Sequence, residues 1–401
     1  MDGLHLLPQE FNVLAKRAIE KLAEHKTASA LLIHHDDADG LCSAAIIKMA
    51  LERKGYTVKT ICLEKVYPEV IATLHSKTDQ IIFYADLGSS HADLISELNN
   101  RRNLTIILDH HDPKPSSDPE VFDLNLENFG YAGETDFSGA TCCYLFAKLL
   151  SDDNADLDYL AIVGSQELPS GYKSVNNLIL EESIRSGRIR REDNVLEVVK
   201  FKIGVSKLFS ILQILGAVGY YEGGPDMGIT VCLEGLNHYI EEKIAAWEDK
   251  RKQVNQKLLG RLYREGLMET EHIQWFDAGD MYAGMGTKVI GQFCSFLSYQ
   301  KRLIKSDKYI IGFINVPPII PKWGELRERL IKASVRVPQK LRDLIDKGML
   351  PGAFQLVEVA SQGFGVADGH RYAASVVLPL NKKEELINNA ERFVCLCSKK
   401  C

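Results

Sequence analysis

The sequence contains no long apolar run. Although 45% of its 401 residues are hydrophobic, no stretch reaches the roughly 18–20 apolar residues that a membrane-spanning helix needs. The N-terminal segment MDGLHLLPQE has Asp2 where a secretory signal carries basic residues. These absences argue against membrane insertion and against secretion, so we expect a cytoplasmic protein with no membrane partner.

Paired cysteines and glycine-rich phosphate loops are also missing. None of the nine cysteines belongs to a CxxC pair, and most lie in apolar stretches, as reduced core residues do. The tail CLCSKKC offers three sulfurs but no obvious fourth ligand, which disfavours a metal site there. No G-x-G-x-x-G follows the first predicted strand, and the glycines of residues 276–288 lack the order of a P-loop, so no dinucleotide site is expected.

A general surplus of basic residues is absent too. The formal net charge of −6 argues against a general polyanion binder. The charge is unevenly distributed, however: residues 301–350 contain twelve Lys and Arg against five Asp and Glu, whereas residues 31–160 are rich in Asp. An acidic centre with a basic segment suits metal-dependent phosphate chemistry, although a charge run alone is more often a solvated helix face.

Short apolar strands alternate with helices in the first half of the chain. Strands are predicted at residues 29–35, 56–63, 80–88 and 104–112, with helices at 11–25, 41–54, 67–75 and 91–101. This alternation indicates βαβ units and a parallel sheet. Residues 176–235 have a mostly helical pattern. We therefore predict an α/β fold.

The chain divides into three predicted segments. Residues 1–240 form the first α/β domain, residues 241–270 a charged linker helix, and residues 271–401 a smaller α/β domain. Strands of the smaller domain are predicted at HIQWFDAG, DKYIIGFINV, IKASVRVP and YAASVVLPL, with helices between and after them.

Aspartates and histidines follow three of the predicted strands. His35, Asp37 and Asp39 alternate after the first, Asp86 follows the run IIFYA, and residues 109–111 (DHH) follow LTIIL. Parallel strands present their carboxyl ends at one edge of the sheet, so these side chains are expected to converge. Carboxylates and imidazoles without thiolates suit Mn²⁺, Mg²⁺ or Zn²⁺, and the ligands suffice for two ions.

His34, which precedes the ligand set, is predicted to be a strand-end histidine with no metal role, and Asp36 is predicted to face outward. Neighbouring side chains on an extended chain point to opposite sides, so these two are not expected among the ligands.

The ordered set of motifs resembles the DHH phosphoesterases. The resemblance lies in HHDDADG at residues 34–40, YADLG around Asp86, DHHDP at 109–113 and the helix SGATCCYLFAKLL from Ser138. In the second domain, SVR (334–336) and DGHRYAAS (368–375) resemble the C-terminal DHH-associated domain. The resemblance covers nearly the whole chain and is greatest to RecJ-type nucleases, especially the archaeal RecJ-like group. It implies an active site in the cleft between a catalytic and a substrate-binding domain.

This resemblance implies two metal ions, Mn²⁺ or Mg²⁺. His35, Asp37 and Asp86 would hold the first ion, and Asp39, Asp86 and His110 the second, with Asp86 bridging. A metal-bound hydroxide would attack the phosphate.

The remaining matching residues are expected to act on the ligands or on the substrate. Asp109 would orient the ligands from behind, and His111 would stabilise charge on the scissile phosphate. In the second domain, four residues would bind the substrate: Ser334, Arg336, Gly369 and His370.

Two stretches depart from the family pattern. In AIVGSQELPSG, Leu168 stands where the family has the Asp that completes the second metal site. We expect Glu167 to serve instead, and not Gln166, because a hard cation prefers a carboxylate to a neutral amide. The loop VADGHRYAAS lacks the triple glycine of the family, so its backbone contact with phosphate is expected to be looser.

The function implied is that of a metal-dependent phosphodiesterase, foremost an exonuclease on single-stranded DNA or RNA. The resemblance to archaeal relatives implies replication or repair proteins as partners. The sequence does not decide between a monomer and a homo-oligomer. Two alternatives remain: a nano-RNase or other small-nucleotide phosphodiesterase, and a catalytically weak RecJ-like scaffold of replication or repair machinery. Crowded carboxylates argue against the scaffold, because like charges repel one another without a metal.

Overall fold

The structure is a computed structural model that describes residues 8–398 except 169 and 194, and for Glu167 the backbone alone. Its contacts divide the chain into two compact units. The first unit consists of residues 1–244 with 321–323, and the second of residues 245–320 with 324–401.

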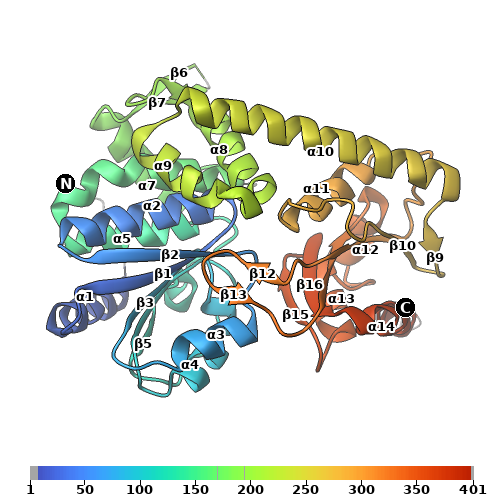
Figure 1. Cartoon of the computed structure of the whole chain (residues 1–401), viewed down its shortest axis with the longest axis horizontal. Coiled ribbons are helices and arrows are strands. Elements are labelled where there is room, and N and C mark those ends of the chain that lie inside the picture. The colour runs from blue at the N-terminus through green and yellow to red at the C-terminus, as the bar shows by residue number, and fades with distance from the viewer. Residues whose placement is uncertain (1–7, 169, 194, 399–401) are drawn as a thin grey trace. The chain divides into compact units, whose positions relative to one another are not determined.

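A five-stranded parallel sheet forms the centre of the first unit (Figure 1). Its strand order is β2-β1-β3-β4-β5, so β1 lies between β2 and β3. The strands are β1 (Ser29–His35), β2 (Thr57–Leu63), β3 (Ile81–Ala85), β4 (Leu104–Leu108) and β5 (Val121–Asp123). The predicted parallel α/β domain is therefore confirmed.

Helices cover both faces of this sheet. Figure 1 shows α2 and α5 on one face and α3 and α4 on the other. Their bounds are α2 (Ala38–Arg53), α5 (Gly139–Leu150), α3 (Pro68–His75) and α4 (Ala92–Asn99). Every residue of β3 and β4 is buried, as expected for parallel strands with helices on both sides, which explains their continuous apolar sequences.

The remaining regular elements of the first unit are helices and one small sheet. The helices are α1 (Gln9–Glu24), α6 (Asp158–Gly164), α7 (Ser174–Arg185), α8 (Val205–Gln213) and α9 (Gly224–Glu234). The antiparallel strands are β6 (Ile189–Glu192), β7 (Val195–Val198) and β8 (Ile203–Gly204). The mostly helical pattern predicted for 176–235 is therefore confirmed, but it did not predict these strands. Three of the four residues of β6 are exposed and charged, so no apolar alternation marked the strand.

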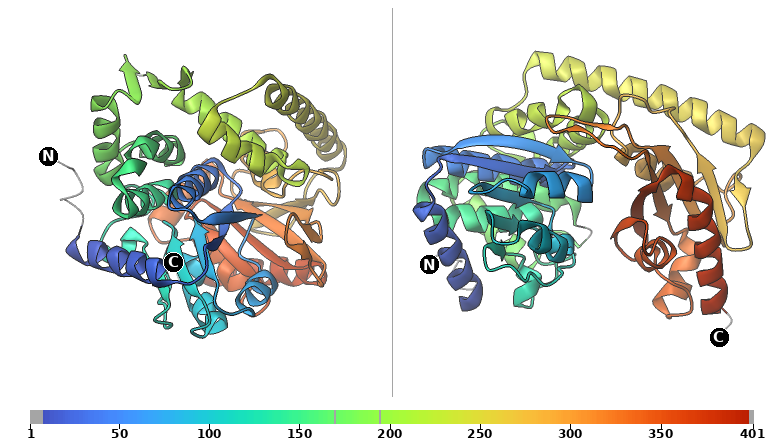
Figure 2. Two further views of the ribbon diagram at one scale, coloured as in Figure 1. Left: turned by 60° about the vertical axis from the view of Figure 1, so that its left-hand side comes forward. Right: turned by 60° about the horizontal axis from the view of Figure 1, so that its bottom comes forward.

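The helix α10 (His238–Glu265) passes without interruption through the boundary between the units (Figure 2). No helix within the described residues is both long enough and apolar enough to cross a bilayer.

A six-stranded mixed sheet forms the core of the second unit, in the order β15-β16-β14-β11-β10-β9. The strands are β9 (Met268–Glu269), β10 (Ile273–Asp277), β11 (Tyr309–Asn315), β14 (Leu330–Arg336), β15 (Val366–Gly369) and β16 (Ala373–Pro379). The helix α11 (Lys288–Leu297) packs against β11 and β14. The other helices contribute to an apolar core with the sheet: α12 (Gln339–Asp346), α13 (Ala353–Ala360) and α14 (Lys383–Ser398). The hairpin β12 (Ile319–Ile320) and β13 (Gly324–Glu325) is separate. This arrangement confirms the predicted α/β fold of the second block.

Candidate metal centre

Aspartates and histidines converge at the carboxyl ends of β1, β3 and β4, which are adjacent parallel strands. His35, Asp37 and Asp86 form one group whose potential ligand atoms all lie within 4.8 Å of one another. Asp86, His110 and His111 form a second group, whose potential ligand atoms also lie within 4.8 Å of one another. Asp86 therefore belongs to both groups. In this sheet β2 lies on one side of β1, and the chain then crosses to place β3 on the other side. Open α/β sheets bind ligands at such a reversal of strand order, beyond the carboxyl ends of the strands.

The first group is tightly packed. His35 Nδ1 lies 2.8 Å from Asp37 Oδ2 and 3.6 Å from Asp86 Oδ2. Asp37 is also the N-cap of α2, since its Oδ1 accepts a 2.9 Å hydrogen bond from Gly40 N. Both carboxylates are nearly inaccessible to solvent, with Asp37 4% and Asp86 1% exposed. The structure thus brings together all three residues expected at the first ion.

Asp86 has an unusual backbone. Its φ of 61° lies in the left-handed region, which costs a residue with a side chain about 1–3 kcal/mol. Its N–H donates to Leu108 O at 2.8 Å, which ties it to β4. The first residue of α5, Gly139, passes so close that a Cβ there would lie 2.2 Å from Asp86 Oδ1. The surrounding backbone therefore fixes the carboxylate shared by the two groups.

His110 presents one ring nitrogen to the carboxylates. Its Nδ1 lies 3.0 Å from Gly133 O, and because a carbonyl only accepts, Nδ1 carries the hydrogen. The lone pair is then on Nε2, which lies 3.5 Å from Asp86 Oδ1 and 3.8 Å from Asp39 Oδ2. This tautomer is the one that a metal-binding imidazole requires.

Asp39 faces the N-terminus of α5. Its carboxylate accepts hydrogen bonds from Ser138 Oγ (3.1 Å), Gly139 N (2.9 Å) and Ala140 N (2.9 Å). The pKa of Asp39 is raised, mainly by burial. The nearby His110 and these backbone donors act in the opposite direction. The structure therefore places Asp39 beside the second group, with much of its hydrogen-bonding capacity used by the helix end.

Asp109 holds His111 from behind. Its Oδ1 lies 2.7 Å from His111 Nδ1, and its Oδ2 accepts a 2.9 Å hydrogen bond from Ser89 N. Burial alone would raise the pKa of Asp109, but the His111 interaction and the other hydrogen bonds hold it well below its usual range. Asp109 is thus an anion that is fully buried, and it fixes the orientation of the partly exposed His111 ring.

The start of the stretch AIVGSQELPSG passes beside Asp39. A Cβ on Gly164, the last residue of α6, would lie 2.3 Å from Asp39 Oδ1. The side chain of Glu167 lies outside the described residues, so its expected role as a ligand stays a prediction. Gln166 Oε1 accepts hydrogen bonds from Tyr172 OH (3.3 Å) and Ser206 Oγ (3.2 Å), and Leu168 is buried.

The structure agrees with the prediction for His34 but not with the prediction for Asp36. His34 Nδ1 donates to His35 O at 2.9 Å, and burial lowers the pKa of His34 to about 4, so the ring is neutral near pH 7. Asp36 was predicted to face outward, which is wrong: it is 1% exposed, with Oδ1 3.2 Å from His35 Nε2. The helical segment around Gly216 packs directly against the Asp36 backbone, since a Cβ at Gly216 would lie 1.7 Å from the Asp36 carbonyl oxygen.

Three of the four residues expected to bind substrate lie on strands β14 and β15 of the second unit, and the fourth, His370, directly follows β15. Arg336 on β14 is paired in register with Ala373 on β16, whose neighbour Ala374 is paired with Gly369 on β15. Gly369 has a φ of 131°, and His370 lies in the exposed turn that follows.

Arg336 is largely enclosed. Its Nε donates to Ser295 Oγ at 2.8 Å, and Nη1 donates to Val335 O at 2.9 Å. Burial lowers the pKa of Arg336. Ser334, two residues earlier on the same face of β14, is 2% exposed.

Sequence reasoning missed the backbone groups that position the ligands. Gly133 O, which sets the tautomer of His110, comes from a loop with no apolar periodicity, and Gly133 N in turn donates to Glu127 Oε1 at 2.8 Å. The small residues of SGA at 138–140 were noted only as part of a helix. A Ser before two small residues is a helix N-cap signal. Because the first N–H groups of a helix bind anions, this signal could have indicated that a carboxylate accepts hydrogen bonds there.

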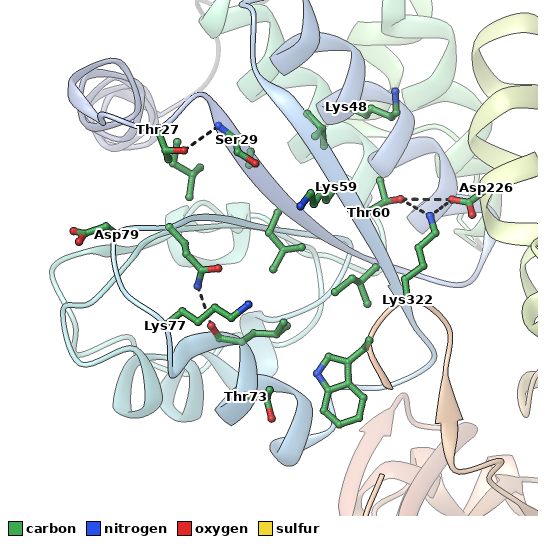
Figure 3. A pocket seen from close by; sticks show the side chains of 18 residues that line it. Thr27, Ser29, Lys48, Lys59, Thr60, Thr73, Lys77, Asp79, Asp226 and Lys322 are labelled. Carbon is green, nitrogen blue, oxygen red and sulfur yellow. Dashed lines mark hydrogen bonds and ion pairs between the residues drawn. The ribbon is translucent and has the colours of Figure 1, made fainter. Parts of the chain in front are cut away.

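The first unit also has a cavity of about 750 Å³ at the opposite ends of the strands (Figure 3). It is lined by early strand residues such as Ser29, Val58 and Ile81, and by Lys48, Lys59 and Lys77. Lys322 reaches into it and pairs with Asp226. None of the candidate ligands lines this cavity, so it is separate from the metal centre.

Comparisons with known proteins agree with this geometry. Residues 29–165 match the model of the DHH family, N-terminal domain. An uncharacterized protein of Methanocaldococcus jannaschii is 32% identical over 162 residues, which are 39% of this chain. The match spans only 36% of that relative. The chain therefore carries a segment, residues 29–165, that is similar to the N-terminal domain of the DHH family.

Solved structures define the fold more closely. The structure of RecJ in complex with Mn²⁺ from Thermus thermophilus superimposes with a TM-score of 0.67 at 16% identity, over 98% of this chain and 56% of that one. An exonuclease RecJ bound to manganese gives 0.62 at 16% identity, over 97% and 96% of the chains. CDC45 from Entamoeba histolytica gives 0.52 at 10% identity, over 96% and 98%. The chain thus has a RecJ-like fold.

Proposed function

We propose that the protein is a divalent-metal-dependent phosphodiesterase that degrades single-stranded DNA or RNA from an end. The observation that carries this proposal is the pair of ligand groups at the ends of β1, β3 and β4, which share Asp86, together with Asp39, whose Oδ2 lies 3.8 Å from His110 Nε2. A carboxylate common to two groups of oxygen and nitrogen ligands suits two ions that act together in attack on phosphorus.

The residues present fit Mn²⁺ or Mg²⁺. Carboxylate oxygens and imidazole nitrogens are ligands for these ions, and the buried carboxylates need a cation to offset their mutual repulsion. His35, Asp37 and Asp86 would hold one ion. Asp86, His110 and Asp39 would hold the other, with Glu167 as a further ligand. When bound, the ions acidify water and neutralise charge on the phosphate.

The chain itself supplies orientation. Gly133 O fixes the His110 tautomer, and the buried Asp109 anion fixes the His111 ring at 2.7 Å. Because a neighbouring carboxylate favours the imidazolium form, His111 is suited to bind a phosphate oxygen and stabilise its charge. Asp109 therefore acts through His111 and is a positioning residue.

A strand-binding role for the second unit is supported by its charge. Residues 301–350 carry the basic surplus, and Arg336 and Gly369 lie on strands of that unit that are separated only by β16. A guanidinium can bind a backbone phosphate, so we assign this role to Arg336. Ser334 and His370 complete the proposed substrate residues.

A scaffold without activity is the second candidate, because the fold that this chain shares with CDC45 does not by itself imply catalysis. The crowded ligand groups weigh against it. Asp37, Asp39 and Asp86 are each at most 4% exposed, and crowding three buried carboxylates is costly in a protein that binds no cation, even though Asp37 and Asp39 also accept hydrogen bonds at helix N-termini.

The experiment is degradation of end-labelled single strands of DNA and RNA by the full chain, with Mn²⁺, Mg²⁺ and Zn²⁺ in turn. We expect stepwise shortening with Mn²⁺ and none without metal. Asp86→Asn should lose hydrolysis, because it removes the shared anion while keeping the side-chain size. Asp93→Asn is the matched control: Asp93 is a half-exposed carboxylate of α4 that is paired only loosely with Lys114, at 3.8 Å.

The substrate series separates the alternatives. Cleavage confined to strands of a few nucleotides would replace the exonuclease by a small-nucleotide phosphodiesterase. Equal activity of Asp86→Asn and wild type would refute the assignment of the centre, and inertness toward every substrate and metal would favour the scaffold.

A further inference from the structure

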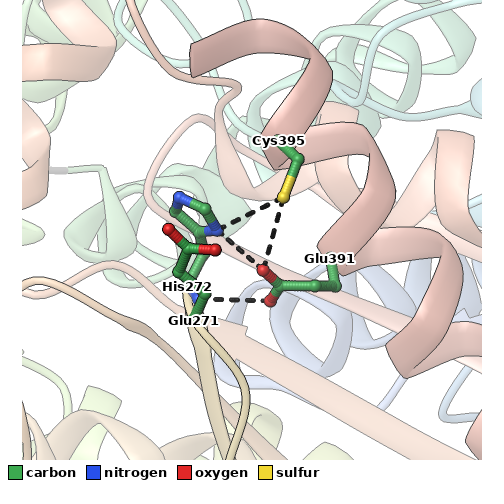
Figure 4. A group of neighbouring side chains, drawn as sticks. All are labelled: Glu271, His272, Glu391 and Cys395. Atoms are coloured by element: carbon green, nitrogen blue, oxygen red, sulfur yellow. Dashed lines mark hydrogen bonds and ion pairs between the residues drawn. The ribbon is translucent and has the colours of Figure 1, made fainter. Parts of the chain in front are cut away.

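A second cluster of metal-ligating side chains lies in the second unit, where the start of β10 meets α14. His272 immediately precedes β10, and Glu391 and Cys395 are one turn apart on the same face of α14. One ligand atom from each of these residues and from Glu271 lies within 4.8 Å of the others. Residues more than a hundred positions apart in sequence therefore meet at one point (Figure 4).

We propose that Glu271, His272, Glu391 and Cys395 form a zinc site that fastens α14 to the β9–β10 edge of the sheet. The set combines a thiolate, an imidazole and carboxylates. Thiolate and imidazole select Zn²⁺ over Mg²⁺ and Mn²⁺, which favour oxygen. The site is independent of the proposed nuclease activity and shares no residue with the centre of the first unit.

The distances fit tetrahedral coordination. With Zn–S near 2.3 Å and Zn–N near 2.0–2.1 Å, sulfur and nitrogen ligands on a tetrahedron lie about 3.6 Å apart. Cys395 Sγ lies 3.7 Å from His272 Nδ1 and 3.6 Å from Glu391 Oε1. His272 Nδ1 and Glu391 Oε1 are hydrogen-bonded at 2.7 Å, so an ion requires these two atoms to separate by only about 0.6 Å.

The surroundings prepare the ligands. Glu391 Oε2 accepts hydrogen bonds from Thr270 Oγ1 and from His272 N, the latter at 3.2 Å. Burial alone would raise the pKa of Glu391, but these bonds and His272 lower it, so the group is an anion near pH 7. His272 and Glu391 keep 22% and 17% of their side chains exposed, which leaves a path for an ion.

The position explains what the site would do. The apolar side of α14 is buried in the core through residues such as Leu386, Ala390 and Val394. Glu391 and Cys395 lie at the border of that side, next to the start of β10. A metal bond there would hold the last turns of the C-terminal helix against the sheet, and binding free energy would add to folding stability.

The test uses the full chain and Co²⁺ as a spectroscopic substitute for zinc. A sulfur-to-cobalt charge-transfer band in the near ultraviolet reports a thiolate ligand, which the first centre does not offer. We expect this band in wild type and in Asp86→Asn. It should disappear in Cys395→Ser and persist in Cys397→Ser, the matched control two residues further along α14.

Zinc affinity and thermal unfolding give a second readout. Measured in the Asp86→Asn background, which weakens the first centre, Cys395→Ser should bind Zn²⁺ at the second site at least about tenfold more weakly than Cys397→Ser, and zinc should raise the unfolding temperature of the control more than that of Cys395→Ser. His272→Gln, which keeps a polar side chain but removes the imidazole, should behave like Cys395→Ser. A wild-type chain without the cobalt–thiolate band, or a band that survives Cys395→Ser, would overturn the proposal and leave only the His272–Glu391 ion pair.

Discussion

Gly139→Ala tests whether the backbone around Asp86 sets the activity. The new Cβ would lie 2.2 Å from Asp86 Oδ1 and 2.6 Å from Asp86 Cβ. Because Asp86 is held by its hydrogen bond to Leu108 and by a left-handed φ, the helix or the carboxylate must move by about 1 Å, an overpacking that costs roughly 1–3 kcal/mol of stability. No candidate ligand is removed by this substitution.

The effect on catalysis should exceed the effect on folding. A misplacement of about 1 Å at a reacting centre lowers the rate roughly 100-fold. We therefore expect Mn²⁺-dependent hydrolysis of a labelled strand to fall about 100-fold, together with weaker Mn²⁺ binding measured by calorimetry. Urea unfolding should show a folded protein with a reduced midpoint.

Gly260→Ala is the matched control. Gly260 lies inside α10 with helical backbone, and the nearest atom to a new Cβ is Arg264 Nη1 at 3.7 Å. This variant should keep wild-type activity and gain up to about 1 kcal/mol from helix propensity. If Gly139→Ala bound Mn²⁺ and cleaved the strand as well as Gly260→Ala does, the claim that α5 positions Asp86 would fail.

Three further predictions follow from the same structure. Asp109→Asn should lower the rate about 10–100-fold at unchanged metal content, because His111 loses its orienting anion; a change in metal content would instead make Asp109 a ligand. Arg336→Ala should weaken strand binding and reduce its salt dependence by about one charge, measured by fluorescence anisotropy, and an unchanged slope would place Arg336 off the path of the strand. Burial lowers the pKa of His75, so its contribution to stability is complete above about pH 6.5 and is lost as the pH falls toward the folded-state pKa. His75→Gln should therefore flatten the pH dependence of urea unfolding below about pH 6.5, whereas a control at the exposed His238 should not.

The elements of the first sheet could be predicted from the sequence because they depend on local pattern. Strands at SALLIHH and LTIIL, buried on both sides, leave continuous apolar runs that end in charged residues. Parallel pairing then brings the ends together, so the convergence of His35, Asp86 and His110 followed from strand order alone. The exposed strands of residues 189–204 left no such signal.

The tertiary structure decided what each side chain contacts. The left-handed backbone of Asp86, the burial of Asp36 beside a distant helical segment, and the capture of Asp39 by the N-terminus of α5 all depend on elements far away in the sequence. The meeting of Cys395 with His272 is of the same kind. CLCSKKC contains no fourth ligand by itself, and only the packing of α14 beside β10 supplies the imidazole and the carboxylates. Periodicity in sequence reports which face of an element is buried, whereas a site depends on the distances between elements, which packing of the whole unit determines.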